Sequence, residues 1–156
     1  MKNFKIWSLM ALVVAFVACE PVDDGGNNGG GGNISEEGLI GEWQLKTWNN
    51  EDSPVDIYLG LKNDGSFELY QRSYTVFYEL YTGSFSVSNG VLSGVYSDGE
   101  AWGSTYSFAL TSEDKILTLT SNSKPTVESV YERSEIPAVV REEAELTRAV
   151  ESEPIL

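Results

Sequence analysis

Residues 57–70 run Ile-Tyr-Leu-Gly-Leu-Lys-Asn-Asp-Gly-Ser-Phe-Glu-Leu-Tyr, and this stretch decides the fold class. Apolar residues recur at alternate positions on both sides of Lys-Asn-Asp-Gly, which is typical of a hairpin turn. Closing the turn gives two apolar cross-strand pairs, Leu61 with Phe67 and Leu59 with Leu69. A slip of one residue would send the two apolar sets to opposite faces. The stretch therefore predicts an antiparallel hairpin with one buried face.

Two further turns predict the same arrangement elsewhere in the chain. Asn89-Gly90 is a strong signal for a two-residue hairpin loop, and residues 111–116 indicate another turn. The two turns predict four more pairs: Val87 with Leu92, Phe85 with Gly94, Leu110 with Leu117 and Phe108 with Leu119. In each hairpin the side chains that point inward are apolar, and Gly94 leaves space for a ring on that face.

Turn signals separate eight predicted strands, at intervals typical of an all-β barrel or sandwich. The strands span 42–48, 55–62, 66–72, 75–87, 91–97, 101–110, 116–121 and 126–133. Most are antiparallel neighbours joined by short turns, and eight such strands can close into a barrel. We therefore expect an all-β, eight-stranded antiparallel up-and-down barrel over residues 34–133, with a flattened sandwich as the alternative. Ser35-Glu36-Glu37 predicts a short N-terminal helical turn before it.

Residues 134–156 are acidic and differ from the strands in composition. Ala138–Val150 predicts either one amphipathic C-terminal helix or a disordered tail, and we favour the helix. An outward tyrosine pair on the 57–70 hairpin, Tyr58 with Tyr70, is the expected seat of this helix. The residues expected to cover the pair are Val139 and Leu146.

The first residues have the features of a lipoprotein signal peptide. Lys2 and Lys5 precede an apolar run that ends at Ala18 and is shorter than the roughly 20 residues needed to cross a bilayer. The only cysteine follows at once, and Phe16-Val17-Ala18-Cys19 resembles the cleavage site of lipoprotein signal peptidase. We expect a signal peptide over residues 1–18, with an ordinary secretory signal as the alternative.

Lipid attached to Cys19 would make a membrane the first partner of the protein. Residues 19–33 form an acidic Gly/Asn linker with almost no apolar content, so we expect a flexible stalk. Asp23 and Asp24 resemble the export signals of surface lipoproteins, although a solvated spacer explains them equally well. The expected location is the outer membrane or the cell surface.

Composition excludes several kinds of partner and chemistry. The chain has 24 acidic against ten basic residues and a net charge of −14, which excludes nucleic-acid binding through phosphate contacts. It has no histidine, so histidine-dependent triads and histidine-ligated zinc sites are absent from it. No carboxylate pair is singled out by its spacing, and no metal motif appears. We expect no enzyme activity, cofactor or metal.

The pattern resembles the lipocalin-like domains of bacterial lipoproteins. Gly41-Glu42-Trp43 is similar to the G-x-W motif on the first lipocalin strand, Leu61–Phe67 to the second hairpin, and Gly83–Val87 to a later glycine-aromatic strand. The resemblance covers residues 39–133 and implies a calycin-type barrel in which Trp43 closes one end. It also implies that a C-terminal helix lies against the barrel exterior. The chain departs from true lipocalins in its lack of a disulfide and its short loops.

Strand alternation brings one carboxylate and several polar-tipped aromatic residues toward the inward face near the other end. The predicted ligand-binding residues are Glu79, Tyr81, Tyr96, Trp102 and Tyr106. Gln71 and Phe77 are further candidates for a functional role. Such residues suit a pocket for a small, partly apolar ligand, and a neutral or cationic one because the chain is acidic. The alternative is that the rings simply fill the barrel.

The sequence leaves three classes of function open, of which a carboxylate hydrolase is the least favoured because it needs two carboxylates that converge in one cleft. In the first, the protein is a membrane-anchored, non-catalytic lipoprotein that binds a small ligand or serves as an envelope scaffold. In the second, it is a surface module that docks an envelope protein and has a solid barrel core without a small-molecule ligand. An internal cavity favours the first class, and a solid core with an exposed apolar patch favours the second.

Overall fold

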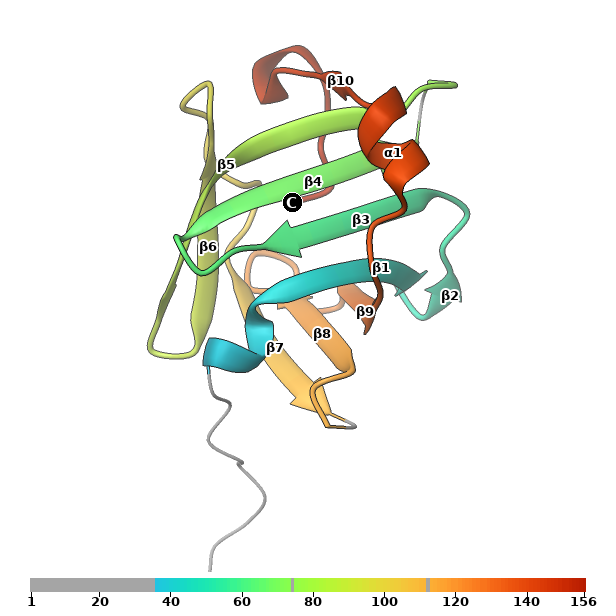
Figure 1. Cartoon of the computed structure of the whole chain (residues 1–156). Coiled ribbons are helices and arrows are strands. Elements are labelled where there is room, and N and C mark those ends of the chain that lie inside the picture. Colours follow the sequence, from blue (N-terminus) through green and yellow to red (C-terminus); the bar gives the residue numbers. More distant parts are fainter. Residues whose placement is uncertain (1–35, 74, 112) are drawn as a thin grey trace, which may run out of the picture. The chain divides into compact units, whose positions relative to one another are not determined.

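The computed structural model describes residues 36–156 apart from residues 74 and 112. The predicted signal peptide, Cys19 and the linker lie outside the described residues. The elements, in chain order, are η1 (Glu36–Leu39), β1 (Gly41–Trp48), β2 (Glu51–Asp52), β3 (Asp56–Leu61), β4 (Ser66–Arg72), β5 (Glu79–Ser88), β6 (Val91–Tyr96), β7 (Tyr106–Thr111), β8 (Ile116–Ser121), β9 (Glu128–Arg133), α1 (Ala138–Glu143), β10 (Glu145–Leu146) and η2 (Ala149–Glu151). Figure 1 shows their arrangement.

Within the described residues the strands form a closed eight-stranded antiparallel barrel. β1 and β3–β9 follow one another around the barrel, because each pairs with the next in sequence apart from the two-residue β2. Pairing of β1 with β9 and of β5 with β6 completes the circle. The up-and-down barrel is confirmed, and the sandwich alternative is wrong because no edge separates two sheets.

The register of the three predicted hairpins is confirmed. Leu61 pairs with Phe67 and Leu59 with Leu69 across the β3–β4 hairpin. The other predicted pairs also form: Val87 with Leu92, Phe85 with Gly94, Leu110 with Leu117 and Phe108 with Leu119. Turn chemistry explains the first two loops, since Gly65, Asn89 and Gly90 adopt the positive φ angles that tight turns require. The alternation of burial along β8 shows the result, with Leu117 and Leu119 fully buried.

Two strands begin four or more residues later than the sequence predicts. β5 starts at Glu79 and not at residue 75, because Thr75 donates a hydrogen bond to the carbonyl of Phe77 and the chain turns there (2.7 Å). β7 starts at Tyr106 and not at residue 101. The preceding residues fold back onto β6, where the amide of Trp102 donates to the carbonyl of Gly94 (2.9 Å). That return brings the Trp102 side chain into the core.

One end of the barrel is closed by Trp43 and Arg133. The Trp43 ring is fully buried and its Nε1 donates to the carbonyl of Leu39 in η1 (2.9 Å). The Arg133 guanidinium lies 4.1 Å from the centre of this ring and donates to the carbonyls of Gly38 and Ile40. These contacts join the last barrel strand to the N-terminal turn, so we name this the closed end.

The core is continuous inside the barrel, but inward residues at the rim are only partly buried. Leu59, Leu69, Leu117 and Leu119 have no exposed surface. Phe85 and Val87 are half-buried, because they lie at the rim beside an open hollow of about 260 Å³. The register correctly predicts which side chains point inward. The position of a residue along the barrel then decides how much of its side chain is exposed to solvent.

The C-terminal helix forms, but over six residues only. α1 ends at Glu143, and the next residue, Ala144, already has an extended backbone. The next residues instead pair in parallel with β5. Among the described residues, no helix has the length and apolar content needed to cross a membrane.

Helix α1 packs on the predicted seat with different side chains from those expected. Tyr58 and Tyr70 are buried on the barrel exterior, under Ile136 and Val140. The predicted covering residues, Val139 and Leu146, are instead 52% and 73% exposed. A helix that stops after six residues presents only one position to the seat, and Leu146 lies beyond its end.

Candidate functional site

Four of the five predicted ligand-binding residues meet in one aromatic cluster at the end of the barrel opposite Trp43. Tyr81 comes from β5, Tyr96 from β6, Tyr106 from β7, and Trp102 from the return before β7. All four are nearly fully buried. The Tyr81 and Tyr96 rings meet edge to face with centroids 6.0 Å apart, and those of Trp102 and Tyr106 at 6.1 Å.

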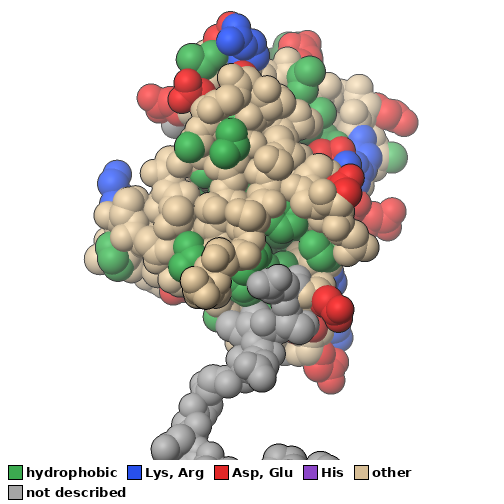
Figure 2. All heavy atoms as spheres, turned by 90° about the vertical axis from the view of Figure 1, so that its left-hand side faces the viewer, with side chains coloured by type: hydrophobic (Ala, Val, Ile, Leu, Met, Phe, Trp, Pro, Cys, Tyr) green, Lys and Arg blue, Asp and Glu red, His purple; other side chains and the backbone are tan. Residues whose placement is uncertain are grey.

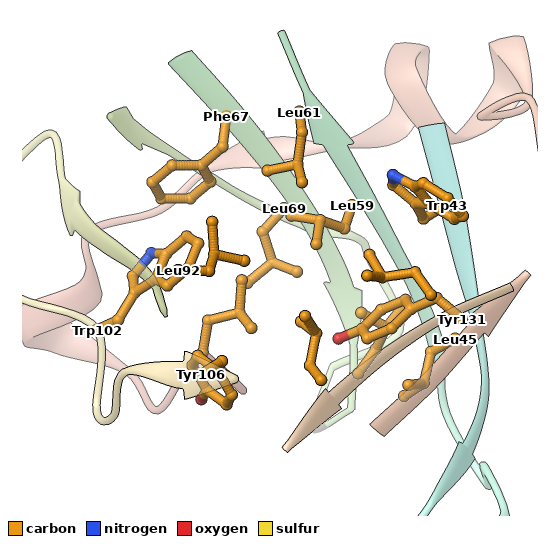
Figure 3. Packing of buried hydrophobic residues seen from close by; sticks show 14 of the residues in the cluster. Trp43, Leu45, Leu59, Leu61, Phe67, Leu69, Leu92, Trp102, Tyr106 and Tyr131 are labelled. Carbon is orange, nitrogen blue, oxygen red and sulfur yellow. The ribbon is translucent and has the colours of Figure 1, made fainter. Parts of the chain in front are cut away.

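Phe67 joins the two halves of this cluster. Its ring centroid lies 5.5 Å from that of Tyr96 and 5.1 Å from that of Trp102, both edge to face. Figure 3 shows Trp102 and Tyr106 on one side of the core and Trp43 on the other, with Leu59 and Leu69 between them. The rings therefore fill the space in which the sequence predicted a ligand.

Gly94 makes the position of Trp102 possible. A Cβ atom at Gly94 would lie 2.3 Å from Cε2 of the indole ring, closer than atoms can approach. The Trp102 ring occupies the space that Gly94 was predicted to leave. The signal for this pairing was present in the sequence, but the return that delivers Trp102 was not recognised.

The C-terminal part of the chain covers this aromatic cluster. We call residues 145–156 the capping segment. The Tyr96 hydroxyl donates to the carbonyl oxygen of Leu156 (2.8 Å), and the hydroxyls of Tyr81 and Ser152 are hydrogen-bonded to each other. Leu156 is 4% exposed and belongs to the core cluster. In Figure 1 the mark C for the chain end accordingly lies within the outline of the barrel.

Gln71 is the residue that holds the capping segment most directly. It lies on β4 and is 2% exposed. Its Nε2 donates to the carbonyl of Glu153 (3.2 Å), and its Oε1 accepts from the amide of Ile155 (2.9 Å). The sequence indicated Gln71 as a candidate for a functional role, but not as one of the predicted ligand-binding residues. Its signal was a polar residue at the inward parity of Phe67 and Leu69.

Glu79 and Phe77 occupy different surroundings. Glu79 lies opposite Gln71 in the β4–β5 register and is half-buried. Its Oε2 atom is buried and has no hydrogen-bond partner within the described residues. Phe77 is 55% exposed and lies outside the aromatic cluster.

Burial keeps the clustered tyrosine hydroxyls protonated. It raises the pKa of Tyr81 and of Tyr106 to about 12, and it also raises the pKa of Tyr96 and of Tyr131. Each hydroxyl is therefore a neutral donor at physiological pH. Within the described part of the chain, the Tyr131 hydroxyl and Nε1 of Trp102 are buried without a hydrogen-bond partner. Two donors thus remain unused inside the barrel.

Two solvent-open hollows lie beside the capping segment. The larger measures about 460 Å³ and is lined by Trp48, Val55, Ile57, Gln71, Lys124 and Ile155, among others. The smaller measures about 400 Å³ and borders Tyr96, Gly103, Ala149 and Leu156. The segment therefore closes the barrel without filling the end of it. The described residues contain no group of three or more His, Cys, Asp or Glu side chains placed to hold a metal ion.

Comparisons with known proteins found similarity at the level of solved structures. No family model matches the chain, and neither does any curated protein. The chain is similar to a lipocalin-like protein from Bacteroides uniformis ATCC 8492, with a TM-score of 0.49 and 15% identity, covering 62% of this chain and 99% of that one. It is also similar to an uncharacterized protein from Bacteroides eggerthii DSM 20697, with a TM-score of 0.45 and 17% identity, covering 61% and 98%.

The order of the elements decides the type of fold. A short 3-10 turn leads into β1, which carries Gly41-Glu42-Trp43, and antiparallel strands then follow in sequence until the barrel closes. The fold is lipocalin-like. The resemblance expected from the sequence is confirmed for the barrel, and α1 lies on the barrel exterior as expected. In this lipocalin-like barrel the closed end is held by Trp43 and the opposite end by the capping segment.

Proposed function

We propose that the protein is a non-catalytic lipoprotein of the cell envelope that binds a small, partly apolar ligand at the capped end of its lipocalin-like barrel. The observation that carries this proposal is the hollow of about 460 Å³ beside the capping segment. Its volume falls in the range of about 300–1,000 Å³ that is usual for small-molecule sites. The ligand would lie at the rim, because aromatic side chains fill the interior.

The chemistry of the hollow supports a ligand with both apolar and polar groups. Val55, Ile57 and Ile155 supply apolar surface, and the indole of Trp48 is 38% exposed and available for stacking. Lys124 and Glu153 contribute one charge of each sign to the lining. The net charge of −14 repels anions from the molecule as a whole, so a neutral or cationic ligand is favoured.

Titration of the purified protein with neutral, cationic and fatty-acid compounds tests this proposal. Binding should change tryptophan emission, since Trp48 borders the hollow, and should raise the melting temperature because only the folded state binds. The Trp48→Ala variant should bind about tenfold more weakly, a loss of about 1.4 kcal/mol. Val76→Ala removes apolar surface at an 80% exposed position outside the hollow and serves as the control. If no compound changes emission or melting temperature, small-molecule binding is excluded for the panel.

The packed interior favours a second candidate, the docking of an envelope protein. Trp102, Tyr106 and Tyr131 pack into the core cluster inside the barrel, so the interior itself offers little room for a ligand. On the face seen in Figure 2, hydrophobic side chains are scattered among polar ones and do not form a single patch. A photo-crosslinker at exposed Phe77 should capture the docked protein in cells, and one at exposed Ser86 should not. Equal capture at both positions would contradict specific docking.

Anchoring through lipid on Cys19 is proposed from the sequence. The Cys19→Ser protein should lose acylation and appear in the soluble fraction, because no acyl chains then hold it in the bilayer. Mass spectrometry and membrane fractionation measure the two effects. Protease treatment of intact cells distinguishes surface exposure, which Asp23 and Asp24 favour, from a periplasmic orientation. A Cys19→Ser protein that still fractionates with membranes after a salt wash would place the anchor elsewhere.

A further inference from the structure

The first half of β5 pairs with β4 along one edge, but no barrel strand of the described residues pairs with its other edge. β6 pairs with β5 from Gly83 to Ser88 only. The first half of β5 is covered instead by the capping segment, which runs parallel to it as β10. The amide of Glu145 donates to the carbonyl of Tyr78 and the amide of Thr147 to that of Leu80, both at 2.8 Å. The segment therefore joins the sheet through main-chain bonds, in the way that an added peptide strand does.

The contacts beyond β10 also use the main chain of the segment. The Gln71 side-chain amide both donates to and accepts from it, which is the pairing that one peptide group offers to another. The Tyr96 hydroxyl donates to the carbonyl oxygen of Leu156 (2.8 Å). Such contacts are available to any extended chain with a suitable backbone, whatever its sequence.

Side-chain contacts of the segment come from the Ser152 hydroxyl, which is hydrogen-bonded to that of Tyr81, and from three apolar residues, of which Ala149 is 8% exposed. Leu156 is 4% exposed, and Ile155 packs against the same core cluster. Most other side chains point outward, with Leu146 at 73% and Val150 at 56% exposure. The segment is thus held by backbone bonds and a small apolar anchor, and helix α1 is attached to the barrel by a separate cluster. None of residues 147–156 belongs to that separate cluster, so we expect their local release to leave α1 on the barrel.

We infer that the capped end of the barrel is a peptide-binding site, that the capping segment occupies it as an internal ligand, and that an extended apolar peptide of a partner protein binds there by displacing it. The peptide presents consecutive apolar side chains in the places of Ile155 and Leu156, and its backbone bonds to Gln71 and Tyr96. A partner is favoured over a second copy of this chain, because a net charge of −14 makes two copies repel each other. This inference goes beyond the small-molecule ligand proposed above and does not depend on it.

A labelled synthetic peptide of residues 149–156 is the probe, and its anisotropy reports binding to the full chain. In the wild type the internal segment should compete and binding should be weak. The Ile155→Ser/Leu156→Ser variant loosens the internal segment and should bind the peptide at least tenfold more tightly. Val150→Ser, which alters an exposed side chain of the same segment, should behave as the wild type. Adding Gln71→Leu to the loosened variant should abolish binding.

Several outcomes would overturn the inference. Failure of the peptide to bind a loosened variant that still unfolds cooperatively would contradict it, and this failure leaves the small-molecule titration of the wild type unaffected. A wild type that dimerises with concentration by exchanging the segment would assign the site to a second copy. If the loosened variant does not fold, hydrogen exchange of the wild type tests whether the capping segment can be displaced. An Ile155 amide that exchanges much faster than the β8 amides supports a displaceable segment, and equal protection overturns it.

Discussion

Gly94 and Trp102 show how one absent side chain organises the interior of this barrel. The indole ring lies directly on Gly94, where any Cβ atom would overlap it. From there it contacts Phe67 and Tyr106, and so connects strands that are distant in the chain. The same principle holds at the closed end, where Gly41 leaves room for the Arg133 guanidinium. Glycine at these positions provides space for a large neighbour.

Gly94→Ala should destabilise the protein by about 1–3 kcal/mol, the usual cost of overpacking a core. The entropic benefit of replacing glycine, about 0.4–1 kcal/mol, is smaller than this cost. Urea unfolding measures the change in free energy, and displacement of Trp102 should also shift tryptophan emission. Gly103→Ala is the control, because its Cβ would meet only one atom, at 3.8 Å. An unchanged stability of Gly94→Ala would mean that the ring moves aside without cost.

At the scale of elements, α1 shows how tertiary contacts set the length of a helix. The sequence 138–150 has helical composition, yet the helix ends at Glu143 and the next residues pair with the open half of β5. Two main-chain bonds to the sheet replace those that another helical turn would have made. Because α1 is short, its hold on the barrel depends on Val140 and on the Arg141 contacts with Glu42 and Glu68.

Val140→Ala should cost about 1–3 kcal/mol, because two buried methyl groups leave the cluster over Tyr58 and Tyr70. Val139→Ala is the matched control, since its side chain is 52% exposed, and it should change the stability by less than about 0.5 kcal/mol. Urea unfolding of the two variants measures the difference. Equal effects at the two positions would mean that α1 does not lie on this seat.

At the scale of the whole barrel, several tyrosines are buried in one interior, so their ionisation is coupled to unfolding. Burial raises the pKa of Tyr81 and of Tyr106 to about 12, whereas the value for an exposed tyrosine is 10.0. Between pH 10 and 12 the unfolded chain therefore loses protons that the folded barrel retains. Because the unfolded state binds fewer protons in this window, the free energy of unfolding falls as pH rises through it.

We expect these tyrosines to leave the free energy of unfolding unchanged below pH 10 and to lower it progressively toward pH 12. Urea unfolding at a series of pH values measures it, and tyrosinate absorbance of the native protein follows ionisation directly. Tyr106→Phe removes one such group and should reduce the slope. Native tyrosines that all ionise near pH 10, with no loss of stability, would contradict the burial described for this cluster.

The sequence by itself determined the barrel and the register of its hairpins, because both depend on local chemistry. Turn residues such as Asn89-Gly90 fix where a strand reverses, and alternation of apolar residues then leaves one register that buries a single face. The gathering of Tyr81, Tyr96 and Tyr106 at one end followed from the same alternation.

Only the tertiary structure decided how that end of the barrel is closed. Gln71 meets the capping segment across 82 and 84 positions of sequence, and β10 forms because β6 leaves half of β5 open. Main-chain bonds of this kind leave no periodic pattern in the segment, since the backbone is the same at every residue. The free edge of a distant strand, and not the helical composition of residues 138–150, therefore determined where the end of the chain lies.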